Sequence, residues 1–283
     1  MDSKTAEAGF PTSVETKIPR IPHDIINEIL DHLATGSNFG TLQSCALVSK
    51  SWVPSCQRHL FHTITFTPED MVRWLKTFPV PGEGPARHVR DLYLTIGGKP
   101  SSYPVAQKSF ECILQFTNAE RVTLSGRGGP RLQTPLWRPM LPQSITSLII
   151  DTDMITLLQI RDIMTQLPNL DDLSLSDSPT VVGDTPQGTG AALRGRFGGK
   201  LQLNGHGACG GVIDMLLGVL TGLHFTEVEI TSWSGCPLSA VSLAEACRKT
   251  LVKLSYAVLF SRSSGKPHPL HRPSWFQCVR CYS

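Results

Sequence analysis

Apolar residues near the start of the chain recur at helical spacing. Between residues 21 and 33 they form one stripe along a predicted helix, whereas acidic and amide side chains occupy the other side. Pro22 suits the first turn of this helix, because the N–H that proline lacks has no helical partner there. A second short helix is expected around Leu42 and a third after Ser51, a favourable N-cap. The pattern therefore predicts three short helices within residues 21–61, the first with the apolar stripe Ile25, Ile26, Ile29, Leu30 and Leu33.

The three helices carry much apolar surface for so short a segment. A segment of this size rarely builds a self-sufficient core. Two interpretations follow and stay open at this level. Either the helices dock on the rest of this chain, or they lay an apolar face into another protein.

Segments with the alternating pattern of a strand recur from residue 89 onward. One apolar anchor in each segment gives successive gaps of 30, 26, 25, 28, 27 and 26 residues. Amphipathic helical patterns fill intervals at residues 105–116, 157–167, 211–220 and 239–250. A near-constant period of this length is typical of a leucine-rich solenoid, in which each unit buries its apolar side against its neighbours. The strand segments are 89–94, 121–124, 145–150, 170–175, 200–203, 226–230 and 251–256, and their anchors are Leu92, Val122, Leu148, Leu173, Leu201, Val228 and Leu254.

These patterns predict an α/β fold with two parts. A small N-terminal three-helix segment precedes an irregular, leucine-rich-repeat-like α/β solenoid with a parallel sheet and outer helices. A compact α/β domain with a parallel sheet is the alternative architecture. The expected boundaries are a disordered segment at 1–20, the three helices at 21–66, the repeat region at 67–262 and an irregular, disordered tail at 263–283.

Alternate residues of each predicted strand point to opposite sides of the sheet. The apolar anchors face the helices, so the mostly polar residues between them face away. This is the ordinary arrangement of a solvated sheet face, and it is also the arrangement of a substrate-binding surface of mixed charge. The candidate substrate-binding positions are Asp91, Tyr93, Arg121, Thr123, Asp172, Ser174, Gln202, Glu227, Glu229 and Lys253.

Composition and charge narrow the classes of function. Hydrophobic residues make up 40% and charged residues 17% of the 283 residues, which is ordinary for a globular protein. The net charge of +3 is too weak to predict nucleic-acid binding. Residues 1–17 lack the apolar core of a signal peptide, and the apolar run at 212–220 is short and contains Asp214, so no membrane span is expected. The eight scattered cysteines are therefore expected as reduced thiols in the cytoplasm or nucleus.

A glycine motif offers an enzymatic alternative. The segment Gly205–Gly210 reads G-x-G-x-x-G between a predicted strand and a predicted helix, and Glu227 and Glu229 follow near the distance of a ribose-binding acid. In a dinucleotide fold, the helix N-terminus would bind the pyrophosphate. The preceding strand alternates in polarity, however, whereas the first strand of such a fold is buried on both sides. We therefore expect no nucleotide cofactor and keep this loop as the alternative.

Other candidate chemistry is sparse. His268 and His271, with Cys278 and Cys281, form two pairs of possible zinc ligands near the chain end. The six residues between the pairs leave little chain to fold around a metal. The remaining histidines have no acid and nucleophile at a recognisable spacing. The sequence thus predicts neither a metal site nor a catalytic site.

The helical stretch 21–61 resembles an F-box. The matching residues are Ile21-Pro22-x-Asp24-Ile25-Ile26-x-Glu28-Ile29-Leu30-x-x-Leu33 and, later, Leu47-Val48-Ser49-Lys50-Ser51-Trp52. The family pattern has leucine, glutamate and cysteine where this chain has Ile21, Asp24 and Ser49. The resemblance implies binding to a Skp-type adaptor and, through it, to a cullin–RING ubiquitin ligase. By the same resemblance, the residues that face the adaptor or hold its docking surface are Pro22, Ile25, Ile29, Leu30, Leu42, Val48 and Trp52.

The combined hypothesis is a substrate-recognition adaptor without a catalytic site. The F-box would bind the Skp-type adaptor, and the leucine-rich-repeat-like part would hold a target protein, as the resemblance to F-box proteins with such repeats implies. A nucleotide-dependent enzyme that uses Gly205–Gly210 is the first alternative. An F-box interaction protein that acts outside any ligase is the second. We expect no nucleic-acid, membrane or cofactor partner.

Overall fold

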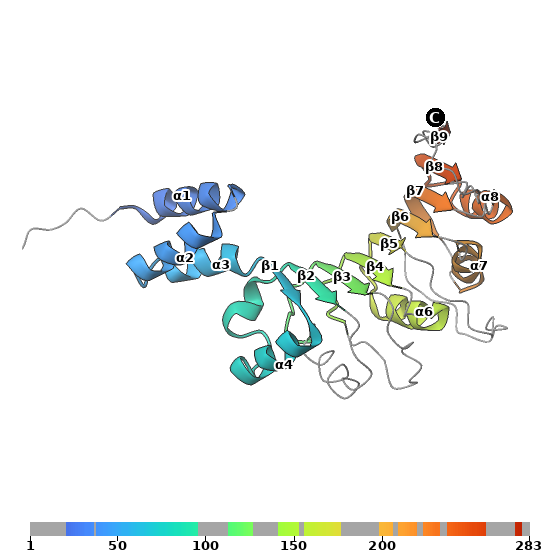
Figure 1. Ribbon diagram of the computed structural model, residues 1–283. Coiled ribbons are helices and arrows are strands. Elements are labelled where there is room, and N and C mark those ends of the chain that lie inside the picture. Colours follow the sequence, from blue (N-terminus) through green and yellow to red (C-terminus); the bar gives the residue numbers. More distant parts are fainter. Residues whose placement is uncertain are drawn as a thin grey trace, which may run out of the picture. The chain divides into compact units, whose positions relative to one another are not determined.

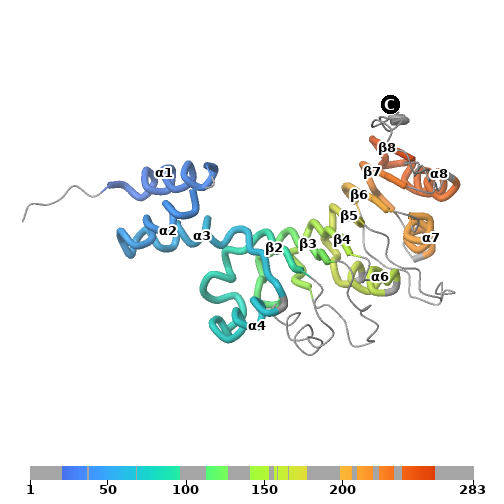
Figure 2. The backbone as a smooth tube through the Cα atoms, in the orientation of Figure 1, coloured from blue at the N-terminus to red at the C-terminus, as the bar shows by residue number. Residues whose placement is uncertain are grey.

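The computed structural model describes most of the chain as two compact units, Met1–Cys56 and Gln57–Ser283 (Figure 1). The backbone trace in Figure 2 follows the same path from the N-terminus to the C-terminus. The described residues are 21–36, 38–95, 113–126, 141–152, 156–176, 198–205, 209–219, 223–232, 237–258 and 275–278.

The first unit consists of short helices packed around a very small core. Helix α1 spans His23–Thr35, α2 spans Phe39–Val48, and α3 begins at Val53 and continues to Leu60 in the second unit. The predicted three helices are therefore confirmed. The hydroxyl of Ser55 donates a 2.7 Å hydrogen bond to Oδ1 of Asn27 and so links α3 to α1. The buried apolar side chains of this unit are Ile26, Leu30, Leu42 and Cys56.

The second unit is organised around one sheet whose strands follow the chain order. Strands β1 to β8 are parallel to one another, and β9 pairs with β8 in the antiparallel direction. In the described part of the sheet, each strand lies beside the strands that precede and follow it in the chain. The strands are β1 (Thr63–Phe66), β2 (Asp91–Thr95), β3 (Arg121–Gly126), β4 (Ser147–Thr152), β5 (Asp172–Ser176), β6 (Gly198–Gly205), β7 (His224–Ser232), β8 (Lys253–Val258) and β9 (Trp275–Cys278).

The strand register confirms the periodicity of the sequence. The apolar anchors of consecutive segments are Cα partners in consecutive strands, so the gaps between them count the residues of one complete strand-to-strand connection. This row is buried except at its last member, Leu254, which is half-buried. The row runs Leu92, Val122, Leu148, Leu173, Leu201, Val228 and Leu254.

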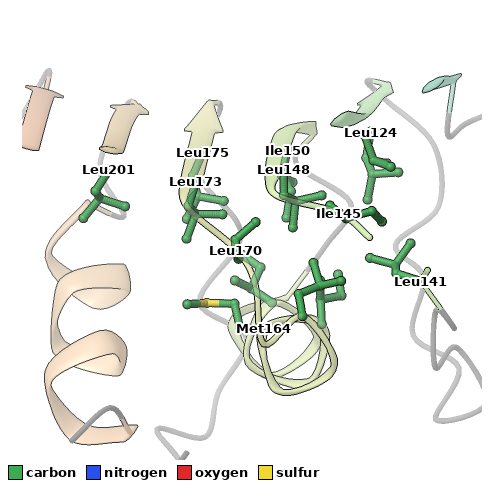
Figure 3. Close-up of a cluster of buried hydrophobic side chains, with 14 of the residues drawn as sticks. Leu124, Leu141, Ile145, Leu148, Ile150, Met164, Leu170, Leu173, Leu175 and Leu201 are labelled. Carbon is green, nitrogen blue, oxygen red and sulfur yellow. The ribbon is translucent and has the colours of Figure 1, made fainter. Parts of the chain in front are cut away.

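Helices cover the apolar side of the sheet. Figure 1 shows α4, α6, α7 and α8 on one side of the row of strands. Figure 3 shows how Leu148 and Leu173 of the strands point toward α6, which contributes Met164. The chain also forms a short 3₁₀ helix, η1, before β2. The helix bounds are α4 (Pro68–Thr77), η1 (Gly84–His88), α6 (Leu157–Gln166), α7 (Cys209–Val219) and α8 (Pro237–Ala246).

Aromatic side chains close the core beside β1. Trp74 of α4 lies 5.4 Å from Phe66 and 5.5 Å from Phe116, measured between ring centroids. Its indole N–H donates a 3.0 Å hydrogen bond to Oε1 of the buried Gln115. The three rings pack together at the β1 end of the core, and the hydrogen bond satisfies the indole N–H and the amide oxygen that are buried with them.

Polar side chains join consecutive connections just before the strands. Asn118 donates to the backbone carbonyl of Arg87 at 2.8 Å, and Asn169 donates to that of Gln143 at 3.2 Å. Ser144 and Thr250 donate in the same way, to Ala119 and Phe225. Each of the four donors lies three residues before the first residue of the strand that follows it, which is β3, β4, β5 or β8. The same local geometry therefore recurs along the chain.

The strand boundaries differ from the predicted ones in a regular way. The second, fourth and fifth strands begin at Asp91, Ser147 and Asp172, two residues after their predicted starts. Buried residues such as Val89 and Ile145 belong to the turn that enters the strand. An apolar run therefore covers both a turn and a strand, and the pattern alone does not separate them.

Two predicted boundaries need correction. Strand β1 lies within the segment 21–66 that was assigned to the helical domain, yet it pairs with β2 of the sheet, and the first unit ends at Cys56. The tail predicted as irregular contains β9, which pairs with β8. The predicted helix at 105–116 lies outside the described residues except for its last four positions, of which Ile113 and Phe116 are buried.

Candidate functional site

The apolar stripe of α1 is divided between two sides of the helix. Ile26 and Leu30 are buried in the first unit, whereas Ile25 and Ile29 remain 43% and 51% exposed. Successive helical residues are rotated by about 100°, so adjacent apolar residues of the stripe point in different directions. The stripe therefore covers more of the helix surface than the small core can bury. Two of the five residues of the predicted apolar face are therefore exposed at the surface.

Helix α2 adds exposed apolar side chains to the same unit. Leu47 and Val48 at its C-terminal end are 89% and 68% exposed, and Phe39 at its first position is also exposed. An apolar surface of this kind on so few residues is the usual mark of a protein-binding site. We call these residues the exposed apolar set: Ile21, Ile25, Ile29, Phe39, Leu47 and Val48.

The predicted adaptor-binding residues occupy two different environments. Pro22, Ile25, Ile29 and Val48 are exposed, and Trp52 is half-buried. By contrast, Leu30 and Leu42 are fully buried, so they can support a docking surface but not contact a partner. The predicted adaptor-binding set did not include Ile21, Phe39 and Leu47, although Ile21 and Leu47 belong to the F-box-like motif. Phe39 and Leu47 lie at the two ends of the short helix α2, Phe39 next to Gly40 and Leu47 shortly before Lys50. This position is the signal that could have identified them as exposed.

Cys56 is a buried thiol in the first unit. Burial raises the pKa of the Cys56 thiol, and the neighbouring Cys45 raises it further. A thiol with a raised pKa holds little thiolate near neutral pH, so it is a poor nucleophile and a poor metal ligand. Cys56 therefore acts as a small apolar core residue.

The second candidate surface is the side of the sheet that the helices do not cover. We call it the open face and define it by the outward residues of β2 to β8. One row, at the start of the strands, runs Asp91, Arg121, Ser147, Asp172, Lys200, Glu227 and Lys253. The next row runs Tyr93, Thr123, Ile149, Ser174, Gln202, Glu229 and Ser255.

The predicted substrate-face residues all lie in these two rows. The structure therefore brings together positions that are far apart in the sequence. Neither row was predicted in full, because the candidate set lacked Ser147 and Lys200 of the first row and Ile149 and Ser255 of the second. Whether any of these residues contacts a substrate remains a prediction.

Ion pairs cross the strands at both ends of the open face. Arg121 lies 3.1 Å from Asp91, and on the other side Lys253 lies 3.7 Å from Glu227. Lys200 lies 3.9 Å from Glu229. These pairs are partly exposed, so each contributes at most about 1 kcal/mol to stability. Their main effect is to neutralise the charge of the flanking strands.

The glycine loop does not have the surroundings of a dinucleotide site. Gly205 ends β6 and α7 begins at Cys209, whereas residues 206–208 lie outside the described residues. Glu227 and Glu229 lie within β7 on the open face, where each faces a lysine. Dinucleotides bind where the strand order of a sheet reverses, and the described sheet has no such reversal.

The proposed zinc ligands of the tail lie outside the described residues, apart from Cys278 in β9. In the described ranges, no three histidine, cysteine or acidic side chains are grouped closely enough to hold a metal ion. No helix of the described residues is long and apolar enough to cross a membrane.

Comparison with known proteins addresses the first unit. No curated protein matches this chain. Domains of the F-box type bind Skp1 within cullin–RING ligases. Residues 18–61, which include α1, α2 and α3, match the F-box domain.

Proposed function

We propose that this chain is a non-catalytic substrate-recognition adaptor of a cullin–RING ubiquitin ligase. Its F-box domain binds a Skp-type adaptor through the exposed apolar set, and its second unit binds a target protein on the open face. The observation that carries the proposal is that the F-box match coincides with the exposed Ile25 and Ile29 of α1. Such a protein works in the cytoplasm or nucleus, where its cysteines stay reduced.

The second unit supports this role if it is a leucine-rich-repeat-like solenoid. Consecutive parallel neighbours, a nearly constant period and the recurring polar hydrogen bonds before the strands all favour stacked repeats. The rival architecture, a compact doubly wound domain, has helices on both faces of its sheet. Here buried and less buried residues alternate along β4 and β5, which favours one covered and one open face.

The proposed mechanism is proximity. One unit holds the ligase scaffold and the other holds the target, so the target's lysines stay at high effective concentration near the transferring enzyme. No residue of this chain needs to take part in the chemistry. The alternative, an F-box interaction protein that acts outside a ligase, would also bind the Skp-type adaptor but would not associate with a cullin.

The proposal is tested by co-expression with a Skp-type adaptor followed by size-exclusion chromatography. We expect a stable one-to-one complex that requires residues 21–61. Ile29→Asp should abolish it, because the substitution places a charge in an apolar interface. Co-purification of a cullin with the complex separates the ligase role from the ligase-independent one.

A matched control uses Val241→Asp, which makes the same kind of change on α8, where Val241 is also exposed. This variant should bind the adaptor as the unchanged chain does. Adaptor binding that survives Ile29→Asp, or that is lost equally in Val241→Asp, would contradict the assignment of the interface to α1.

A further inference from the structure

The centre of the open face differs from its flanks in charge. Strands β4 and β5 contain no basic residue on either side of the sheet. Their outward positions carry two carboxylates, Asp151 and Asp172, and otherwise serines and the half-buried Ile149. The chain as a whole has a net charge of +3, so this acidic centre runs against the overall composition.

The carboxylates of the centre lack the partners that those of the flanks have. Within the described part of the chain, neither Asp151 nor Asp172 forms an ion pair or a side-chain hydrogen bond. The register neighbour Lys200 lies beside Asp172, but its ammonium group lies 3.9 Å from Glu229 on the other side. As far as the described residues go, the two carboxylates are therefore free to pair with a cation from outside the sheet.

An independent observation points to a ligand at the same place. Thr123 is the register neighbour of Ile149, on the same side of the sheet, and it is only 9% exposed. Its hydroxyl has no hydrogen-bond partner among the described residues. Buried hydroxyls nearly always have a partner in native proteins, so an orphan on an otherwise open sheet face indicates a missing one.

We infer that β3, β4 and β5 bind an extended basic segment of the target protein. This inference rests on the proposed function and names the chemistry of its substrate. Asp172 lies at the first row and Asp151 at the third, four residues further along the strands, which is about 13 Å at 3.3 Å per residue. In an extended peptide, residues i and i+4 face the same side at the same separation. Two basic side chains spaced by four, with an apolar one between them over Ile149, match this surface.

The probe is a fluorescein-labelled peptide of sequence GSRTLTRSG, and the protein is the full chain in complex with the Skp-type adaptor. Fluorescence anisotropy at low ionic strength should show saturable binding that weakens as salt is added. The permuted peptide GSRRTLTSG keeps the charge but breaks the spacing, and it should bind several-fold more weakly. The acidic peptide GSETLTESG should not bind.

The decisive variant is Asp151→Asn combined with Asp172→Asn. It should weaken peptide binding about three- to tenfold, the loss expected for two partly exposed ion pairs. Glu245→Gln on α8 removes a carboxylate from the helical side and should leave binding unchanged. Thr123→Val should raise the melting temperature and weaken binding at least twofold, because it removes a hydroxyl that only the peptide satisfies. A purely structural role would change the melting temperature alone.

Several results would overturn the inference while the adaptor complex still forms. These are equal binding by the double variant, equal binding of the permuted peptide, or no binding of the basic peptide. A lower melting temperature of the double variant would also overturn it, because it would mean that a basic segment of this chain already covers the carboxylates. Loss of the adaptor complex itself would instead overturn the proposed function, and size-exclusion chromatography of the same samples separates the two cases.

Discussion

The two units of this chain use leucine and isoleucine in opposite ways. In the sheet unit, the apolar row of every strand from β2 to β7 is buried and the opposite side is mostly polar. In the helical unit, Ile26 and Leu30 are buried, while Ile25 and Ile29 beside them stay exposed. The adjacent strands and helices of the sheet unit bury each other's apolar faces, whereas a short helical unit has too little chain to cover its own. We therefore propose the exposed side of α1 as the surface for another protein.

The largest predicted effect is the difference in stability between two variants that place a charge on opposite sides of β4. Leu148→Asp buries a carboxyl group in the core of the sheet and should destabilise the second unit by more than about 4 kcal/mol. Ile149→Asp puts the same group on the half-buried open side and should cost about 1 kcal/mol, the range of strand propensities. Urea unfolding of both variants measures the difference. Similar losses would contradict the division into a covered and an open face.

That division could be predicted from sequence because the spacing of the apolar anchors follows from the register of parallel strands. The seven anchors form one continuous row, since each strand has the same local period and each connection has nearly the same length. Strand β1 escaped prediction because it has only four residues, two of them exposed, and follows shortly after a helix. The burial of Thr123 depends on neighbours from two other strands, so its own sequence context carries no signal.

The adaptor site could be predicted only in part. The F-box pattern located the segment, and the predicted residues included three of the six members of the exposed apolar set. It did not show which members of the stripe turn inward. Ile29 and Leu30 are adjacent in sequence and chemically alike, and a rotation of about 100° separates an exposed from a buried position. Only the packing of α1 against its neighbours decides between them.

Truncation of these two neighbours should separate stability from binding. Leu30→Ala removes a fully buried side chain and should destabilise the first unit by about 2–5 kcal/mol. Ile29→Ala should leave stability within about 0.5 kcal/mol and weaken adaptor binding by about 1–2 kcal/mol, or five- to thirtyfold. Circular dichroism gives the stabilities and isothermal titration calorimetry gives the affinities. If Ile29→Ala destabilised the unit as strongly as Leu30→Ala, the exposed set would belong to the fold and not to an interface.

The smallest predicted effect concerns how helices begin in the two units. Helix α1 follows Pro22 and has no side-chain cap, whereas α4 begins with a capping box in which Thr67 and Asp70 bond each other's backbone. The hydroxyl of Thr67 donates to Asp70 at 2.7 Å, and this bond, with that from the Thr67 backbone N–H, lowers the pKa of the Asp70 carboxyl. The sheet unit thus fixes this helix locally, while α1 depends on packing.

Thr67→Ala should cost about 1 kcal/mol at pH 7. Because the pKa of Asp70 is lower in the folded state, its bond to Thr67 stabilises the fold above the unfolded pKa and is lost as pH falls through the folded one. The stability difference between the variant and the unchanged chain should therefore narrow as pH falls from 7 to 3. Thr77→Ala, which removes a hydroxyl from the other end of α4, should show no such dependence. A difference that stays constant with pH would mean that the Asp70 carboxylate plays no part in the cap.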